Sequence, residues 1–227
     1  MEQYSTTFAK CYAQSPKWEK SIVPAFQRIF KIKLNSHSKI LDLGCGSGDL
    51  IPIVNKFGVN KDNYIGIDSS EAMIKIAKQR YAEYTFYNEF AQSFCDKYEL
   101  GNAFDLVVSS MVFCVFTTPK ELFKAFEQVS LTLKTGGSFV LLVPHPLNDP
   151  YMQNKSEATN YFKSGEIYCS KKKLVNEVEL VFSDTHWLIG DYVSAAAKSG
   201  LLLEAVDECY SANYTVPYHI MFTFKKC

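Results

Sequence analysis

The stretch ILDLGCGSGDL, residues 40–50, is an apolar run followed by glycine at positions 44, 46 and 48. A glycine-rich turn after a strand lets the backbone approach a ligand closely, because no Cβ intervenes. The helix that follows directs its free N–H groups to the same place. In an open α/β sheet, ligands bind at the carboxyl ends of the strands, where this turn lies. The stretch therefore predicts a nucleotide-like cofactor.

The spacing of the glycines indicates which kind of cofactor is bound. A dinucleotide fingerprint, G-x-G-x-x-G, needs glycine at position 49, which is Asp49 here. An acid beside the loop would repel a pyrophosphate and suits a cofactor without phosphates. A second acid, Asp68, ends the next apolar run, IGID. One carboxylate can accept hydrogen bonds from both hydroxyls of a ribose.

Short β-like runs alternate with helical stretches from residue 39 onward, which is typical of a parallel sheet with helices on both faces. We expect strands near 39–43, 63–67, 84–88, 104–109 and 138–143, and helices near 49–57, 70–82, 90–98 and 119–133. The fold class is therefore α/β: a Rossmann-like open sheet of about seven strands, mostly parallel with an antiparallel C-terminal strand.

Three further signals complete the predicted organisation. A capping box, Thr118 to Glu121 with Pro119 at the first helical position, begins the helix near 119–133, and Gly136 and Gly137 are expected to end it. We expect further helices at 5–14, 17–31 and 189–199. We also expect an antiparallel pair of strands at 166–170 and 177–183, and two last strands of the sheet at 201–209 and 217–225. We expect one domain over 1–227, with a helical lid at 1–35 and a substrate cap at 144–185.

Composition narrows the function classes. Lysine plus arginine equals aspartate plus glutamate, so the net charge of zero argues against a nucleic-acid surface. No apolar stretch is long enough for a membrane span, and the first residues do not resemble a signal peptide. The seven cysteines form no C-x-x-C pair, which favours reduced thiols and a cytoplasmic location over disulfides or zinc. No set of clustered carboxylates indicates a metal.

Four motifs occur in order over residues 39–143: DLGCGSG, YIGIDSSEAM, AFDLVVSSMVF and LKTGGSF. Together they resemble the successive motifs of class I S-adenosylmethionine-dependent methyltransferases. The resemblance implies S-adenosylmethionine as cofactor, with a small-molecule substrate and neither nucleic acid nor membrane as a partner. It makes no prediction of oligomeric state.

The resemblance also implies roles for individual residues. Gly44, Cys45 and Gly46 would line the methionine and ribose, Asp42 would anchor the loop or reach the amino group through water, and Ser109 would lie near the amino group of the methionine. Asp68 would bind the ribose hydroxyls, and Ser69 and Met73 would flank the adenine. Glu89 and Phe90 lie where an acid usually meets the adenine amino group, and Tyr12 would belong to a lid segment. The family usually has Gly-Asp-Ala where this chain has Asn88, Glu89 and Phe90, so the register at Glu89 stays open. For Tyr12 the alternative is an ordinary core aromatic.

Methyl transfer is an in-line displacement that depends mainly on proximity, so a base is needed only where the acceptor must lose a proton. His145, just past the fifth strand, and His186, before the last helix, are the candidate bases, and a buried structural histidine is the alternative for each. Function is therefore predicted as methyl transfer to an oxygen, nitrogen or carbon of a small molecule. The alternatives are another reaction of the bound cofactor, such as a cyclisation, or a regulatory role.

Overall fold

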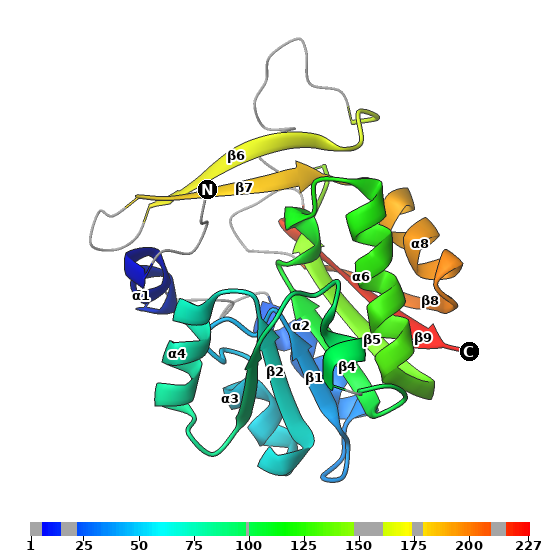
Figure 1. Cartoon of the computed structure of the whole chain (residues 1–227). Coiled ribbons are helices and arrows are strands. Elements are labelled where there is room, and N and C mark those ends of the chain that lie inside the picture. Colours follow the sequence, from blue (N-terminus) through cyan, green and yellow to red (C-terminus); the bar gives the residue numbers. More distant parts are fainter. Residues whose placement is uncertain (1–5, 15–21, 99, 148–160, 174–178, 210–216) are drawn as a thin grey trace.

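A seven-stranded sheet forms the centre of the protein in the computed structural model, which describes residues 6–14, 22–98, 100–147, 161–173, 179–209 and 217–227 (Figure 1). The strand order is β3-β2-β1-β4-β5-β9-β8. The strands are β1 (Ile40–Leu43), β2 (Tyr64–Asp68), β3 (Thr85–Asn88), β4 (Phe104–Ser110), β5 (Leu133–Pro144), β8 (Leu201–Cys209) and β9 (His219–Lys226).

The sheet is parallel from β3 to β5, and β9 runs antiparallel to both of its neighbours. Ile40 of β1, for example, lies opposite Tyr64 of β2 on one side and Leu106 of β4 on the other. The predicted α/β class, the strand count and the antiparallel C-terminal strand are confirmed.

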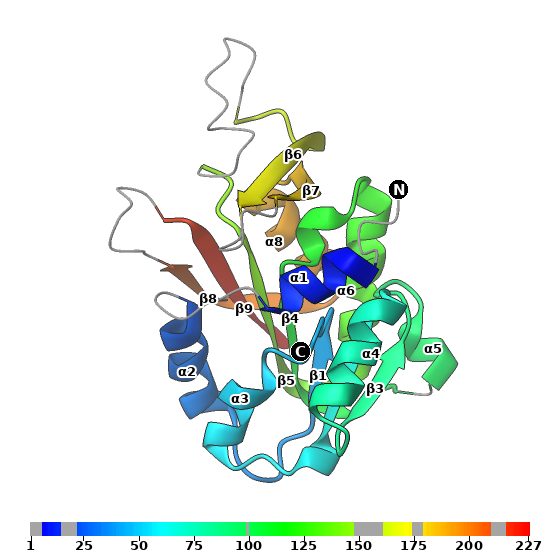
Figure 2. The same cartoon turned by 90° about the vertical axis from the view of Figure 1, so that its left-hand side faces the viewer.

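Helices cover both faces of the sheet because the buried strands alternate their apolar side chains between two cores. The helices are α1 (Thr6–Gln14), α2 (Ile22–Lys33), α3 (Ile51–Val54), α4 (Glu71–Arg80), α5 (Phe94–Tyr98), α6 (Pro119–Thr132) and α8 (Ile189–Lys198), with short 3-10 turns η1 (Asn55–Phe57), η2 (Lys61–Asn63) and η3 (Phe113–Val115). One core lies under α2, α3 and α4, with α2 and α3 side by side (Figure 2), and the other lies under α5, α6 and α8.

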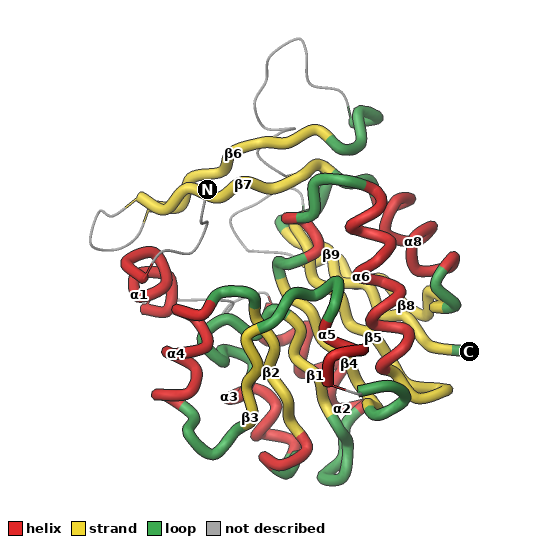
Figure 3. The backbone as a smooth tube through the Cα atoms, in the orientation of Figure 1, coloured by secondary structure: helices red, strands yellow, loops and turns green. Residues whose placement is uncertain are grey.

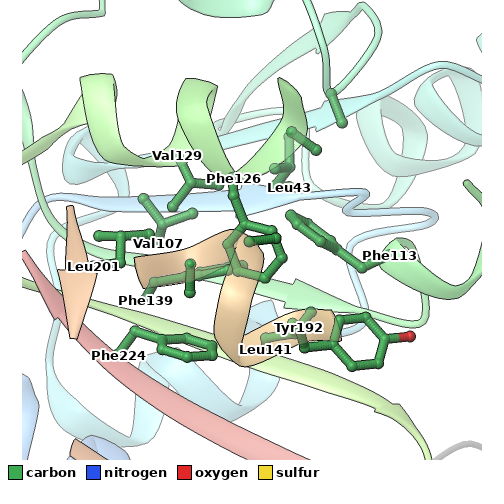
Figure 4. Packing of buried hydrophobic residues seen from close by; sticks show 14 of the residues in the cluster. Leu43, Val107, Phe113, Phe126, Val129, Phe139, Leu141, Tyr192, Leu201 and Phe224 are labelled. Atoms are coloured by element: carbon green, nitrogen blue, oxygen red, sulfur yellow. The ribbon is translucent and has the colours of Figure 1, made fainter. Parts of the chain in front are cut away.

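Aromatic rings fill the second core (Figure 4). Phe126 of α6 packs edge-to-face on Phe113, Phe139 and Phe224, with ring centroids 4.9 to 5.8 Å apart. Such pairs stabilise a core beyond the burial of their area, by about 0.5–1.5 kcal/mol each. This packing fixes η3 and the start of α6 against the sheet, next to the carboxyl end of β4.

Three helix boundaries differ from the sequence prediction. The capping box between Thr118 and Glu121 is present, but α6 ends at Thr132, before the predicted glycines. Leu133 is already extended, and Gly136 adopts its φ of +80° within β5. The helix expected at 49–57 is one turn of α-helix followed by a 3-10 turn, and the helix expected at 90–98 begins only at Phe94. Pairing of Leu133 with Phe104 of β4 begins β5 directly after α6, and such pairing is not visible in local sequence.

A separate two-stranded hairpin, β6 (Glu166–Lys173) and β7 (Glu179–His186), lies over the carboxyl ends of the parallel strands (Figures 1 and 3). Its antiparallel pairing was predicted, although β6 extends through residues 171–173, past the end expected at 170. Helix α1 lies beside α4 under the same hairpin. Among the helices of the described residues, none has the length and apolarity that crossing a membrane requires.

Candidate functional site

A cavity of about 300 Å³ opens at the carboxyl ends of β1, β2 and β4. This volume lies at the lower end of the range for small-molecule sites. The lining residues are Tyr12, Leu43, Gly44, Gly46, Ile67, Asp68, Ser69, Met73, Glu89, Phe90, Ala91, Gln92, Ser110, Met111, Val112, Val115, Phe116, Thr117 and Glu121. Eight of the predicted cofactor residues are among them: Tyr12, Gly44, Gly46, Asp68, Ser69, Met73, Glu89 and Phe90.

The glycine loop forms the floor of the cavity. The N–H groups of Gly44 and Cys45 both donate to the carbonyl of Ile67, at 2.7 and 2.9 Å, which holds the turn against β2. Gly44 has a φ of +80°, and a Cβ at this position would lie 2.0 Å from Cγ2 of Val112. Position 44 therefore requires glycine for both its backbone conformation and its space.

Asp68 is held in place before any ligand binds. The Gly46 N–H donates to its Oδ2 at 2.9 Å, and the Ser70 N–H donates to its Oδ1 at 2.8 Å. Each carboxylate oxygen can accept further hydrogen bonds. The side chain is half-buried on the cavity wall. This arrangement suits the recognition of two neighbouring hydroxyls.

Glu89 and Phe90 lie where β3 ends. The Phe90 N–H donates to Oε1 of Glu89 at 3.0 Å, and Lys97 pairs with Oε2. The hydrogen bond from Lys97, together with that from Phe90, lowers the pKa of Glu89, so the carboxylate is ionised near neutral pH. The ring of Phe90 is 61% exposed at the cavity wall. An exposed aromatic face beside a carboxylate can stack on a flat heterocycle and accept from its amino group.

Three predicted cofactor residues do not line the cavity. Asp42 is 3% exposed, and its Oδ2 accepts a hydrogen bond from the Tyr64 hydroxyl at 2.5 Å on the other side of the loop. Cys45 is buried, with its thiol turned back toward the Gly46 carbonyl. Ser109 donates from Oγ to the carbonyl of Leu43 at 2.8 Å and so ties β4 to β1. All three side chains therefore support the glycine loop on the side away from the cavity.

Neither candidate base lies on the cavity wall. His145 is 1% exposed, its Nδ1 accepts from the Leu147 N–H at 3.2 Å, and its Nε2 lies 3.2 Å from Oε1 of Glu208. His186 is fully buried, and its Nε2 lies 2.9 Å from the carbonyl of Tyr161. The described contacts of both rings are structural.

Tyr12 connects α1 to the hairpin above the cavity. Its ring packs edge-to-face on Phe182 of β7, with centroids 5.9 Å apart, and Phe8 lies against both rings. Burial, followed by the charges of Asp49 and other nearby groups, raises the pKa of Tyr12, so the phenol stays protonated. Helix α1 is also fixed from below, because Arg80 donates to the Ala13 carbonyl at 2.7 Å.

Asp49 plays a different part from the one the sequence indicated. It lies 3.3 Å from Arg80 in an ion pair and accepts from the Ser47 hydroxyl, and it is not on the cavity wall. Its charge is therefore partly neutralised, so Asp49 does not by itself exclude a cofactor that carries phosphates. Among the described residues, no group of histidine, cysteine or acidic side chains could hold a metal ion.

Most lining residues that sequence reasoning missed follow β4. Ser110 and Met111 come directly after Ser109, and Met111 takes an unusual φ of +60° while its N–H donates to the Leu142 carbonyl. The motif SSMVF contained them, but the fourth strand was expected to end one residue early. Glu121 was recognised only as part of a helix cap, and Thr117 was not singled out. No local signal shows that a cap also faces a cavity.

The aromatic residues of the predicted cap, and Trp187 just after it, lie in different environments. Trp187 is buried and donates from Nε1 to the Phe116 carbonyl at 3.0 Å, whereas Phe162 is 79% exposed. Tyr168 is buried on the hairpin, and Tyr151 lies outside the described residues.

Comparisons with known proteins agree with this geometry. Residues 40–137 match the family model described as a methyltransferase domain. The chain is similar to a carboxy-S-adenosyl-L-methionine synthase of Nautilia profundicola, with 34% identity over 113 residues, which is 50% of this chain and 47% of that protein. It is also similar to a ubiquinone/menaquinone biosynthesis C-methyltransferase of Campylobacter jejuni, with 32% identity over 80 residues, which is 34% of this chain and 33% of that protein. The chain thus spans half or less of the length of these curated relatives.

The fold is similar to solved structures over a greater length. A crystal structure of an S-adenosylmethionine-dependent methyltransferase from Clostridium acetobutylicum superposes with a TM-score of 0.68 at 16% identity, covering 90% of each chain. At this identity the likeness concerns the fold.

Proposed function

We propose that the protein transfers a methyl group from S-adenosylmethionine to an oxygen, nitrogen or carbon of a small molecule. The match of residues 40–137 to a methyltransferase-domain model and the similarity in fold to a solved S-adenosylmethionine-dependent methyltransferase support this proposal. The cavity beside the glycine loop is the proposed site of both ligands. We also propose a cytoplasmic location, with residues 1–35 as the lid and the segment 144–185 as the cap.

The geometry of Asp68 carries this proposal. A carboxylate at the end of β2, fixed by two backbone N–H groups and facing the cavity, is suited to hold the two ribose hydroxyls. Ser69 and Met73 lie on the same wall, where they would flank the adenine, and Gly44 and Gly46 leave room for the methionine. When bound, the cofactor supplies a methyl group on a positively charged sulfur. The protein would supply alignment, which can contribute about 7–11 kcal/mol when the geometry is ideal.

We assign no base to the reaction. His145 and His186 lie behind the wall, so we propose structural roles for both. A methyl group on a sulfonium already has a good leaving group, and proximity to the acceptor is the main requirement.

The second candidate is a reaction that modifies the cofactor instead of methylating an acceptor. The similarity to a carboxy-S-adenosyl-L-methionine synthase is the observation in its favour. Incubation with S-adenosylmethionine labelled in the methyl group separates the two, because only a methyltransferase moves the label to an acceptor and releases S-adenosylhomocysteine.

Calorimetry with S-adenosylhomocysteine tests the cofactor site directly. We expect a Kd in the micromolar range, about −7 to −8 kcal/mol. Asp68→Ala should weaken binding far more than Glu89→Ala, because two charge-assisted hydrogen bonds of about 1.5–3 kcal/mol each are lost. Clear binding of NAD with no response to either S-adenosyl compound would overturn the proposed function.

A further inference from the structure

All formally charged side chains on the cavity wall are acidic. Asp68, Glu89 and Glu121 line it, and among its described lining residues there is no lysine, arginine or histidine. Wall charges of one sign raise the local concentration of ligands of the opposite sign. The cavity therefore favours cations.

All three carboxylates have described contacts, since Glu121 completes the capping box of α6, but those of Glu89 and Asp68 leave them less able to act on a second ligand. Glu89 pairs with Lys97, which offsets its charge. Asp68 accepts from two backbone N–H groups and, on the proposed function, is engaged by the ribose. Glu121 is the carboxylate left to act on whatever lies beside the cofactor.

Glu121 is oriented by neutral donors that leave one oxygen available. Its Oε2 accepts from the N–H and hydroxyl groups of Thr117 and Thr118, at 3.0 to 3.1 Å. Burial opposes ionisation, but these four hydrogen bonds prevail and lower the pKa of Glu121, so it is charged near neutral pH. Within the described part of the chain, Oε1 has no hydrogen-bond partner.

A second polar atom on the wall is available to a ligand. Oγ of Ser110 is buried and has no hydrogen-bond partner among the described residues. A buried hydroxyl without a partner is uncommon, and an N–H or O–H group of a ligand would satisfy it.

We propose that the methyl acceptor is a small-molecule amine, recognised in its ammonium form by Glu121. This inference rests on the proposed function. The ammonium first releases one proton to water. The nitrogen lone pair then attacks the methyl carbon, the bond to sulfur breaks, and sulfur keeps the electron pair. The products are neutral S-adenosylhomocysteine and a methylated ammonium, so charge and atoms balance.

Three cofactor analogues and S-adenosylmethionine itself test the charge preference at the position of the transferred methyl. Sinefungin carries an amino group on the carbon that replaces sulfur, and S-adenosylhomocysteine carries nothing there. Carboxy-S-adenosyl-L-methionine carries a carboxylate on the carbon that is the methyl of S-adenosylmethionine. By calorimetry we expect sinefungin to bind at least tenfold more tightly than S-adenosylhomocysteine, and S-adenosylmethionine at least tenfold more tightly than its carboxylated form.

Glu121→Gln should reduce both ratios at least threefold. Glutamine is also accepted at this position of a capping box, so the helix is preserved. Glu127→Gln is the matched control, because Glu127 lies on the same helix, 41% exposed in an ion pair with Lys124 and off the cavity wall. It should leave both ratios unchanged.

The outcomes distinguish failure of the proposed function from failure of the amine acceptor alone. If S-adenosylhomocysteine does not bind, the proposed function fails. If it binds, but sinefungin gains nothing or the carboxylated form binds as tightly as S-adenosylmethionine, only the amine acceptor is overturned. This comparison uses the wild-type protein and holds even if Glu121→Gln does not fold.

A thermal-shift experiment distinguishes a small-molecule amine from the lysine side chain of a protein. With S-adenosylhomocysteine saturating, ethanolamine should raise Tm, whereas glycolate should not. A tetralysine peptide that raises Tm more than ethanolamine does would assign the acceptor to a protein side chain and overturn the small-molecule part of the proposal.

Discussion

Replacing Asp42 with asparagine should make the stability of the protein less dependent on pH. Asp42 is 3% exposed in β1, beside the hydroxyl of Tyr64. Burial raises its pKa from 3.8 to about 7, the Tyr64 hydrogen bond opposes that rise, and the charges of Asp49 and Asp68 add to it.

The sign and size of the effect follow from proton linkage. Between about pH 4 and pH 7 the folded protein keeps a proton on Asp42 that the unfolded chain has released. Stability therefore falls as the pH rises through this window and levels off above the folded pKa. One pKa unit corresponds to about 1.4 kcal/mol, so the full shift costs about 4 kcal/mol, of which roughly 2.6 kcal/mol accrues between pH 5 and pH 8.

Urea denaturation of both proteins between pH 5 and pH 8 measures this effect. The free energy of unfolding of Asp42→Asn, relative to wild type, should increase by about 2–3 kcal/mol across that range. Asparagine still accepts from Tyr64, and burying its NH₂ group costs about 1–3 kcal/mol at every pH, which shifts the curve without changing its slope. Asp62→Asn, at a side chain 69% exposed, is the control. Parallel pH curves for wild type and Asp42→Asn would refute the reasoning, because Asp42 would then be ionised in the folded protein throughout.

Three other substitutions test the site and its surroundings. Gly44→Ala should abolish detectable S-adenosylhomocysteine binding in calorimetry, because the new Cβ would lie 2.0 Å from Val112 at a φ of +80°; unchanged affinity would contradict the tight packing of the loop. His145→Ala should cost about 1–3 kcal/mol in denaturant unfolding and leave cofactor affinity and kcat within about twofold, because its contacts are structural; a hundredfold loss of kcat at unchanged stability would instead make it a base. Trp187→Phe leaves the Phe116 carbonyl without its N–H donor, so Tm should fall by the equivalent of about 1–3 kcal/mol; an unchanged Tm would show that the carbonyl finds another donor.

The parts of the site that could be predicted from sequence depend on local patterns. Gly44 and Gly46 follow a strand, and Asp68 ends the next one, so parallel pairing alone brings them to one edge. The capping box at Thr118 was equally local. Asp42 could not be placed, because its partner Tyr64 lies on a neighbouring strand and decides which way the carboxylate turns.

Contacts between distant segments explain the remaining differences. Arg80 of α4 binds both Asp49 and the carbonyl of Ala13, which changes the electrostatic meaning of the acid in the loop and fixes α1. The contact of Tyr12 with Phe182 joins segments far apart in the chain. Neither pairing leaves a periodic or spacing signal in the sequence.

The place of β9 in the sheet has a consequence for synthesis on the ribosome. In the sheet, β8 pairs only with β9, which follows it in the chain and separates it from β5. As the chain emerges, β8 has no strand available to pair with it until β9 follows, so both of its edges are open. Leu202, Leu203 and Val206 lie on this strand and stay exposed in the folded protein as well. Transiently exposed apolar segments and open strand edges are prone to aggregation and are the surfaces that chaperones bind. A chain truncated between residues 209 and 219 and released from the ribosome should therefore be recovered with a chaperone bound, whereas the chain that includes β9 should not.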